Sequence, residues 1–373
     1  MFVVKVFAKF FRCFKLRNKM VMLISFADNP EQITKKMEEL GVTPETVIYY
    51  DPRLNPSIMT KPFTTMIPIK VTTILARLYH LSTAKVVIID NYFPELAAVK
   101  WREGVTCLQI WHANGALKKF AWEDKSVPYR KKKEQERFKS VYQAFQYVVT
   151  GSDEMATIFK RSFLLDEKRI LKIGVPSTDF FFNLNEMETS KHKVLKQFPN
   201  KKIILYAPTF RDHELNKATV LLDIKKMEEM LASDYILLLK LHPAITKELA
   251  ISQNDFVKQV PNTFQMKDLL AACDILITDY SSSPFEFALL KRPIYFFTPD
   301  LEKYDQSRGL VSSFQNIIPG KIYRTTTDLA KGILNHEADL EKIAQFARTW
   351  NQYSNGHSSE NIVRLVAEKL TKE

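Results

Sequence analysis

Cysteine is scarce in this sequence, which holds only Cys13, Cys107 and Cys273 in 373 residues. Their spacing matches no metal-binding pattern, and three thiols argue against a disulfide scaffold. We therefore expect the chain to work in a reducing compartment, the cytoplasm. No apolar run is long enough to cross a bilayer, so we expect no membrane-spanning segment.

Signatures of two common nucleotide sites are missing as well. The sequence contains no GxxxxGK[ST] phosphate loop, which argues against an ATP-driven P-loop enzyme, and no GxGxxG fingerprint. It contains no recognisable nucleic-acid-binding module, so we expect no nucleic-acid partner. No cluster of acidic residues, or of cysteine and histidine, has metal-ligand spacing. We therefore predict no tightly bound metal or cofactor.

What the sequence does contain is a large apolar fraction and an excess of positive charge. Hydrophobic residues make up 46% and aromatic residues 12% of the chain, as in a well-packed globular protein. The length of 373 residues suits two domains of ordinary size. The formal net charge of +12 points to anionic partners, such as phosphorylated substrates or anionic lipid.

The first 20 residues form a basic stretch without any acidic residue. At helical period, apolar residues gather on one side and basic residues on the other. The apolar side holds Val3, Phe7, Phe10, Phe11 and Phe14, and the basic side holds Lys5, Lys9, Arg12, Lys15 and Lys19. Such a helix is typical of an interfacial membrane anchor. The alternative is a helix packed on its own domain, with a basic face that is merely solvated.

Strands alternate with helices along the rest of the chain, which predicts βαβ units and parallel sheets. The expected strands are Met20–Ser25, Thr46–Tyr50, Lys85–Asp90, Val105–Trp111, Phe145–Gly151, Ile170–Pro176, Ile203–Tyr206, Tyr235–Leu241, Ile275–Ile277 and Ile294–Phe297. The expected helices are Asn29–Leu40, Pro68–Leu81, Tyr129–Lys139, Leu222–Ala232, Lys267–Ala272, Thr327–Asn335, Asp339–Trp350 and Ser359–Lys372.

A polar segment, Asp179–Asn200, separates two series of such units. We therefore expect a membrane-contacting helix at residues 1–19 and two Rossmann-like domains at residues 20–185 and 186–373. The terminal helix is a candidate for packing back on the first domain.

The stretch from Asp274 to Tyr304 reads as strand, polar turn, helix and strand. We expect Ser283 to cap the helix, Pro284 to take its first position and Glu286 to complete a capping box. A helix N-terminus offers unpaired N–H groups and partial positive charge, and the serines add hydroxyl donors, so the turn suits a phosphate. The alternative is an ordinary capped helix without a ligand.

Two histidines and an arginine also follow strands. His112 comes at the end of Val105–Trp111, with Asn114 next to it and Lys118 in a segment expected to open a helix. Arg211 and His242 each follow a strand of the second series. Ligands of open α/β sheets bind beyond the carboxyl ends of strands, so these groups converge if the two halves face each other. For His112 the alternative is a structural histidine bonded to backbone.

Five ordered motifs resemble a known family. They are WHANGALK (Trp111–Lys118), YAPTFR (Tyr206–Arg211), KLHP (Lys240–Pro243), ITDYSSSPFEFALLKRPIYFFTPD (Ile277–Asp300) and YDQSRGL (Tyr304–Leu310). Together they resemble the CDP-glycerol glycerophosphotransferase family of teichoic acid synthesis. IIDNY (Ile88–Tyr92) and Ala113 after the histidine are similar to the primase branch of that family.

The resemblance implies an α/β protein of GT-B-like fold, with two doubly wound parallel-sheet domains and a cleft between them. It implies transfer of one glycerol phosphate from CDP-glycerol, with release of CMP. The acceptor would be the N-acetylmannosaminyl-N-acetylglucosaminyl diphospho-undecaprenol lipid of wall teichoic acid linkage-unit synthesis. It further implies a peripheral protein on the cytoplasmic side of a Gram-positive cell membrane, with an anionic membrane surface and a teichoic acid synthesis complex as candidate partners.

The resemblance also assigns candidate roles to individual residues. His112 matches the catalytic histidine of the family and is the expected base toward the acceptor hydroxyl. His242, the second candidate catalytic residue, and the substrate-binding candidates Arg211, Ser281 and Ser282 are expected to meet the charge on the departing CMP. The remaining candidate substrate-binding residues are Thr209, Asp279, Ser283, Glu286, Asn114, Lys118 and Arg308. For Asp279 the alternative is capping of the turn. A donor diphosphate can bring Mg²⁺ with few protein ligands, so Mg²⁺ is a candidate companion of the donor.

Alternatives remain within and beyond the family. A polymerase of glycerol phosphate or a ribitol-phosphate transferase would share these motifs. A sugar-nucleotide glycosyltransferase of GT-B architecture would share the fold. A non-catalytic protein that binds the membrane surface is a third class, and it would release no CMP.

Overall fold

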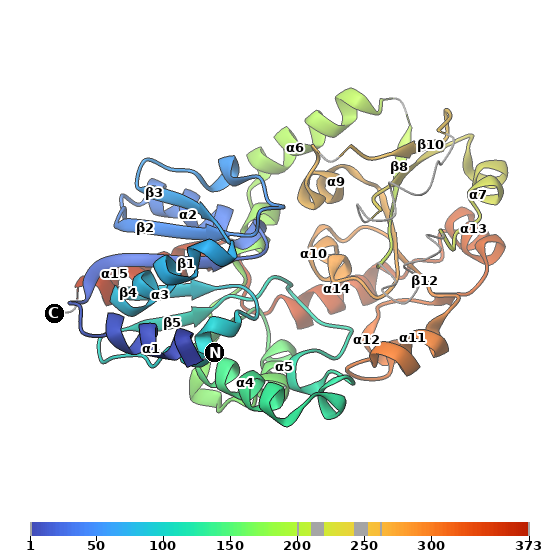
Figure 1. The fold of residues 1–373 in the computed structure, drawn as a ribbon. Coiled ribbons are helices and arrows are strands. Elements are labelled where there is room, and N and C mark those ends of the chain that lie inside the picture. The colour runs from blue at the N-terminus through green and yellow to red at the C-terminus, as the bar shows by residue number, and fades with distance from the viewer. Residues whose placement is uncertain (1, 200, 210–219, 242–252, 262, 372–373) are drawn as a thin grey trace. The chain divides into compact units, whose positions relative to one another are not determined.

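The computed structural model describes residues 2–199, 201–209, 220–241, 253–261 and 263–371 (Figure 1). The chain forms two compact units. Unit 1 comprises Met1–Asn114, Phe120–Asp179 and Asn351–Glu373. Unit 2 comprises Gly115–Lys119 and Phe180–Trp350. The chain passes from one unit to the other at Asp179–Phe180, a few residues before the expected boundary, and it returns to unit 1 for its last helix.

Unit 1 is built on a parallel sheet of seven strands within the described residues, in the order β3-β2-β1-β4-β5-β6-β7. Its strands are β1 (Arg17–Ile24), β2 (Glu45–Tyr50), β3 (Thr64–Pro68), β4 (Ala84–Ile89), β5 (Thr106–Gln109), β6 (Tyr147–Thr150) and β7 (Ile170–Lys172). This is the Rossmann strand order, in which the winding direction reverses between β1 and β4. Groups that follow β1 and β4 therefore flank the switch point where such sheets bind ligands.

Helices cover this sheet and shield its apolar strands. They are α1 (Phe2–Phe11), α2 (Asp28–Glu39), α3 (Ile74–Thr83), α4 (Lys132–Gln143), α5 (Asp153–Phe163) and α15 (Ser358–Thr371). From α15, Ile362, Val363 and Val366 lie in one buried core cluster with Met22, Ile88 and Leu108 of the strands. Ser358 N and Ser359 N donate to the carboxylate of Asp179 at 2.9 and 2.7 Å. Helix α15 is thus part of the unit 1 core.

Unit 2 has a second parallel sheet, with β10-β9-β8-β11-β12-β13 as the order of its described strands. They are β8 (Lys202–Ala207), β9 (Tyr235–Leu239), β10 (Val257–Gln259), β11 (Ile275–Thr278), β12 (Ile294–Phe297) and β13 (Ile322–Tyr323). Its helices include α6 (Leu184–Gln197), α7 (Ile224–Leu231), α9 (Met266–Ala272), α10 (Ser283–Phe287), α11 (Leu301–Arg308), α12 (Phe314–Ile317), α13 (Thr326–Leu334) and α14 (Leu340–Trp350). The order is again Rossmann-like, with its reversal between β8 and β11.

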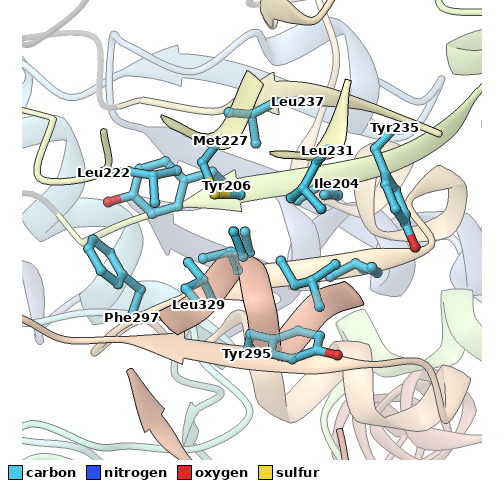
Figure 2. Close-up of a cluster of buried hydrophobic side chains, with 14 of the residues drawn as sticks. Ile204, Tyr206, Leu222, Met227, Leu231, Tyr235, Leu237, Tyr295, Phe297 and Leu329 are labelled. Atoms are coloured by element: carbon cyan, nitrogen blue, oxygen red, sulfur yellow. The ribbon is translucent and has the colours of Figure 1, made fainter. Parts of the chain in front are cut away.

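Alternating residues of the unit 2 strands build its core on one face of the sheet. Figure 2 shows Ile204 and Tyr206 of β8 packed with Met227 and Leu231 of α7 and with Leu329 of α13. All of these side chains are buried. The period of two along β8 follows from strand geometry, because successive side chains point to opposite faces.

The structure corrects three of the expected elements. The first helix ends at Phe11 and β1 begins at Arg17, so Lys19, predicted on the basic side of that helix, is a buried strand residue. Residues 64–68 form the edge strand β3, so the predicted helix Pro68–Leu81 does not begin until Ile74. Gly115–Lys119 is not the start of a helix. Lys118 instead bridges Leu310, Lys119 N donates to Gly309 O at 3.0 Å and Val311 N donates to Leu117 O at 3.0 Å. This extended pairing satisfies backbone groups that a helix would have paired internally.

Helix α1 packs on unit 1 through part of its apolar side. Ala8 is buried and Phe7 and Phe11 are half-buried, and the Phe11 ring lies edge-on to Tyr79 of α3 with centroids 5.6 Å apart. Phe2, Val3, Val6, Phe10 and Phe14 are exposed. The basic residues Lys5, Lys9, Arg12 and Lys15 are exposed too. The apolar side predicted as one surface is thus divided between the domain and solvent.

Candidate active site

In unit 1, three neighbouring strands end in residues that contact one another. Ser25 and Phe26 follow β1, Asp90 follows β4, and His112 comes shortly after β5. The strands pair in the order β1, β4, β5, so their carboxyl ends lie side by side. These groups therefore stand at the switch point of the sheet.

The imidazole of His112 is half-buried and has three close neighbours. One of them is the adjacent Trp111 ring, with centroids 4.2 Å apart and 31° between planes. His112 Nδ1 lies 2.9 Å from Asp90 O. A carbonyl oxygen only accepts, so Nδ1 carries the proton, and Nε2 is the nitrogen of the neutral ring that can accept one. The Phe26 ring is stacked on the imidazole, with centroids 4.1 Å apart and 15° between planes.

The carboxylate of Asp90 is fully buried and fixes the turn after β1. It accepts from Ser25 N at 2.9 and 2.8 Å and from Phe26 N at 2.8 Å. Burial raises the pKa of Asp90 to about 8, against the lowering effect of the N–H donors. One residue thus positions both His112, through its carbonyl, and Phe26, through its carboxylate.

The residue before the histidine has an unusual backbone. Trp111 has φ of 52°, in the left-handed region that is costly for a bulky side chain. Gln109 Oε1 accepts from Trp111 N at 2.9 Å, and Asn29 Nδ2 donates to Trp111 O at 3.0 Å. Such a conformation persists only where its surroundings hold it, and here polar side chains bind both the N–H and the C=O of Trp111.

Asn114 is 1% exposed, and its Nδ2 donates to Asn351 Oδ1. Gly151 leaves room for it, because a Cβ there would lie 2.8 Å from Asn114 Oδ1. The structure therefore places this predicted substrate-binding side chain inside unit 1, where it joins the histidine motif to the returning C-terminal segment.

In unit 2, the predicted carboxylate ties two strand ends together. Asp279 follows β11 and is 1% exposed. Its Oδ1 accepts from Thr209 N, just after β8, at 2.8 Å and from Tyr280 N at 2.6 Å. β8 and β11 are the strands between which the winding reverses, so Thr209 and Asp279 lie at the switch point of the second sheet.

The serine turn begins its helix one residue earlier than expected. Ser282, not Ser283, is the N-cap of α10, and the Ser282 side chain makes no capping hydrogen bond. Ser281 Oγ instead accepts from Ser283 N at 3.2 Å and lies 3.0 Å from Ser283 Oγ. Ser281 and Ser282 are half-buried and Ser283 is buried. Glu286, in the first turn of α10, is half-buried.

Aromatic contacts connect this turn to α11. Tyr280 stacks on Tyr304 with centroids 3.7 Å apart, and its hydroxyl donates to Asp300 Oδ1 at 3.0 Å. Arg308 ends α11 and is half-buried. Lys118 pairs with Leu310, two residues beyond Arg308. The structure thus brings the predicted Lys118 and Arg308 to neighbouring backbone positions. Arg211 and His242 lie outside the described residues.

Neither a membrane span nor a metal cluster occurs in the described part of the chain. Residues 2–199, 201–209, 220–241, 253–261 and 263–371 contain no helix long and apolar enough to cross a membrane. Within the same ranges, no group of three or more His, Cys, Asp or Glu side chains is arranged to hold a metal ion.

Comparison with known proteins identifies the family. Residues 6–368 match the family described as "CDP-Glycerol:Poly(glycerophosphate) glycerophosphotransferase". The chain belongs to this family. The family resemblance and the enzyme class expected from the motifs, a CDP-glycerol glycerophosphotransferase, are thereby confirmed.

Family members with assigned activities cover most of the chain. The teichoic acid glycerol-phosphate primase of Bacillus subtilis (strain 168) is 37% identical over 371 residues, which are 98% of this chain and 95% of the primase. The teichoic acid ribitol-phosphate primase of Bacillus spizizenii (strain ATCC 23059 / NRRL B-14472 / W23) is 35% identical over 302 residues, or 79% of this chain and 77% of that one.

A solved structure supports the fold. A variant of the wall teichoic acid polymerase TagF, soaked with CDPG, has a TM-score of 0.80 and 25% identity, covering 98% of this chain and 93% of that one. With a parallel sheet of Rossmann order in each unit, the expected GT-B-like fold class is confirmed.

Two residues of the histidine site do not stand out in the sequence. The strand pattern places Asp90 only at the end of a strand, and it gives Phe26 no role. An acidic residue directly after an apolar strand, as in Ile88–Asp90, is an available signal for a polar role at the sheet edge. Nothing in the sequence around Phe26 indicates its partner, because the contact depends on which strands are neighbours.

Proposed function

We propose that this protein is a teichoic acid glycerol-phosphate primase. It transfers one glycerol phosphate from CDP-glycerol to the lipid-linked disaccharide acceptor, the N-acetylmannosaminyl-N-acetylglucosaminyl diphospho-undecaprenol lipid. The observation that carries the proposal is the 37% identity to the Bacillus subtilis primase across 98% of this chain. The histidine motif lies inside that match, at the switch point of the unit 1 sheet.

His112 is the proposed general base. In the reaction, an acceptor hydroxyl oxygen forms a bond to the phosphorus that carries glycerol, and the bond from that phosphorus to the bridging oxygen of the diphosphate breaks. CMP leaves with the bridging oxygen, and the hydroxyl proton passes to Nε2 of His112. The contact of Nδ1 with the Asp90 carbonyl supports this role, because it leaves Nε2 as the accepting nitrogen.

Residues of unit 2 are proposed to bind the donor. The Ser281 and Ser282 hydroxyls follow β11 at the second switch point, where Asp279 fixes the turn through backbone N–H groups. Arg308 and Lys118 supply positive charge on neighbouring segments. Arg211 and His242 complete the proposed set on the strength of their motifs. Charged and hydroxyl donors of this kind stabilise the charge that develops on the departing CMP.

Helix α1 is proposed to hold the protein on the cytoplasmic face of the membrane. α1 and the segment that follows it expose Phe2, Val3, Val6, Phe10 and Phe14 together with the basic residues Lys5, Lys9, Arg12 and Lys15. Apolar side chains of this kind enter the boundary of head groups and acyl chains, and lysines meet anionic lipid. The placement suits a soluble donor and a lipid-bound acceptor.

Product analysis on a defined acceptor tests the proposal. Purified protein is incubated with a lipid disaccharide analogue and CDP-glycerol, and the product is weighed by mass spectrometry. A primase yields the acceptor plus one glycerol phosphate and an equal amount of CMP. A ladder of longer products would identify a polymerase, and no CMP release would contradict an enzymatic role on this donor.

A ribitol-phosphate transferase is the second candidate. The 35% identity to a ribitol-phosphate primase over 79% of this chain favours it over more distant activities. The same incubation with CDP-ribitol separates the two. Transfer from CDP-ribitol but not from CDP-glycerol would replace the first proposal by the second.

A further inference from the structure

Phe26 is a large apolar side chain that is not buried in the core of unit 1. It lies in the turn after β1 and remains 40% exposed. Its ring nevertheless makes a close parallel contact with His112, with centroids 4.1 Å apart and planes at 15°. A half-exposed ring gains less from burial than a core residue, so its contact with the imidazole is the feature that needs an explanation.

The backbone of Phe26 is fixed by the residue that also fixes the histidine. Phe26 N donates to Asp90 Oδ2 at 2.8 Å, and Ser25 N donates to both carboxylate oxygens. The carbonyl of the same Asp90 accepts from His112 Nδ1 at 2.9 Å. Asp90 thus sets the position of one ring through its side chain and that of the other through its main chain.

These contacts constrain different motions of the imidazole. The hydrogen bond to Asp90 O selects the tautomer and limits rotation about the bond to the ring. The stacked Phe26 restricts tilting of the ring plane, together with the Trp111 ring, whose centroid lies 4.2 Å from that of the imidazole. An aromatic face also attracts a cation, so it favours the imidazolium that forms when His112 takes a proton.

We propose that Phe26 is a positioning residue for the reaction, which holds the imidazole of His112 in the plane where Nε2 meets the acceptor hydroxyl. The inference rests on the proposed role of His112 as general base. Phe26 acts through the histidine and need not touch either substrate.

Two substitutions at position 26 test whether the aromatic ring itself is needed or only an apolar side chain. Leucine is apolar without a ring, and tyrosine keeps the ring. Phe26→Leu keeps an apolar side chain over the imidazole but removes the flat face. We expect kcat on a soluble acceptor to fall about tenfold, because general-base catalysis depends on the position of the base. The KM of Phe26→Leu for CDP-glycerol should stay within about twofold of the wild-type value. Phe26→Tyr should keep the wild-type kcat, because it keeps the flat aromatic face. Phe182→Leu is the matched control, since Phe182 is 44% exposed in unit 2.

The protonation of His112 gives a readout that does not depend on turnover. Spectra of protein with ¹⁵N-labelled histidine, assigned with His112→Ala, report the tautomer and the pKa of the ring. In Phe26→Leu we expect a pKa about half a pH unit lower, because the face that favours the cation is gone, and a less uniform Nδ1–H tautomer. The acid limb of the pH profile of kcat should move in the same direction.

The outcomes separate the two proposals. Unchanged kcat, pKa and tautomer in Phe26→Leu would overturn the role of Phe26 while His112 stood as base. An equal fall in kcat in Phe26→Leu and Phe26→Tyr would also overturn the role of the Phe26 ring. Full activity of His112→Ala would overturn the assignment of His112 as base. The positioning role of Phe26 would then fall too, whatever the spectra show.

Discussion

At the scale of single residues, the proposed chemistry depends most on His112. Replacing it by alanine removes the group that accepts the hydroxyl proton and leaves the Asp90 carbonyl in place. We expect kcat to fall about 10²–10⁴-fold, the usual contribution of a positioned base. Initial rates of CMP release measure the loss, and thermal unfolding checks that the variant is folded.

His357 provides the control for that substitution. Its side chain is 67% exposed in the segment before α15, where its Nδ1 lies 3.4 Å from Glu360 Oε2. His357→Ala should release CMP at the wild-type rate. Comparable rates in both variants would remove His112 from the mechanism.

A second histidine makes the stability of the fold depend on pH. Lys19 is fully buried, and its Nζ lies 3.0 Å from His80 Nδ1. Burial and the neighbouring Lys19 charge lower the pKa of His80 to about 4. Between pH 4 and 6.5 the unfolded chain therefore binds a proton that the folded chain does not. The stabilisation is present above pH 6.5 and is lost as the pH falls toward 4.

We expect this loss to reach about 3 kcal/mol, since each pKa unit corresponds to about 1.4 kcal/mol. Urea unfolding at several pH values measures it. His80→Gln keeps an acceptor for Lys19 but does not titrate, so its stability should fall less between pH 6.5 and 4. His192→Gln, at an exposed position of α6, should follow the wild type. Identical pH profiles in His80→Gln and the wild type would refute the assignment.

At the scale of elements, α1 combines packing with exposure. Ala8 is buried, and Phe11 contacts Tyr79, whereas Phe10 on the same helix is 56% exposed. Phe10→Ser, combined with Phe2→Ser, should weaken binding to vesicles of phosphatidylglycerol about tenfold or more, because each loses apolar area that enters the lipid. Flotation assays measure the bound fraction.

The control for the membrane helix lies in the other unit. Leu340 of α14 is 50% exposed, and Leu340→Ser should leave vesicle binding unchanged. Activity on a soluble acceptor should survive in the α1 variant. Equal vesicle binding by the α1 variant and the control would rule out α1 as the anchor.

Gly115, within the histidine motif, makes a close approach to another segment of unit 2. A Cβ at Gly115 would lie 2.4 Å from Phe285 Cδ1 of α10, and Phe285 packs on Phe346 and Trp350. Gly115→Ala should therefore lower the free energy of unfolding by about 1–3 kcal/mol, the usual cost of overpacking. Urea unfolding measures the change, and Phe285→Leu in the same chain should recover part of it.

Gly320 offers a glycine where the same methyl group fits. The nearest atom to its Cβ would be Ile294 O at 3.8 Å, an ordinary contact. Gly320→Ala should keep the wild-type stability. A Gly115→Ala variant as stable as Gly320→Ala would show that α10 can shift away without cost.

At the scale of the whole molecule, the chain completes its first unit with its last helix. Val366 of α15 is fully buried in the unit 1 core beside strand residues such as Ile88. Val366→Ala should reduce the stability of this unit by about 2 kcal/mol through lost contacts and a small cavity. Leu334→Ala, at a position of α13 that is 46% exposed, should have little effect. Equal melting curves for both variants would contradict a structural role for α15 in the unit 1 core.

The two units differ in how far the sequence predicts their sites. In both, the carboxyl ends of strands can be located, because apolar runs that end in polar residues are a local signal. In unit 2, the capping alternative for Asp279 matches its contacts with two backbone N–H groups. In unit 1, the contacts of His112 with Asp90 and Phe26 cannot be predicted from the sequence, because the three residues follow different strands.

The sequence by itself determined the parallel sheets, the amphipathic first helix and the family. Strand alternation, helical period and the motifs are each formed by residues that lie close together in the sequence. Only the tertiary structure decided that Phe26 stacks on His112, that Asp90 fixes both, that β3 forms an edge and that α15 returns to unit 1. The reason is that strand order in space, not position along the chain, sets which side chains meet at the end of a sheet.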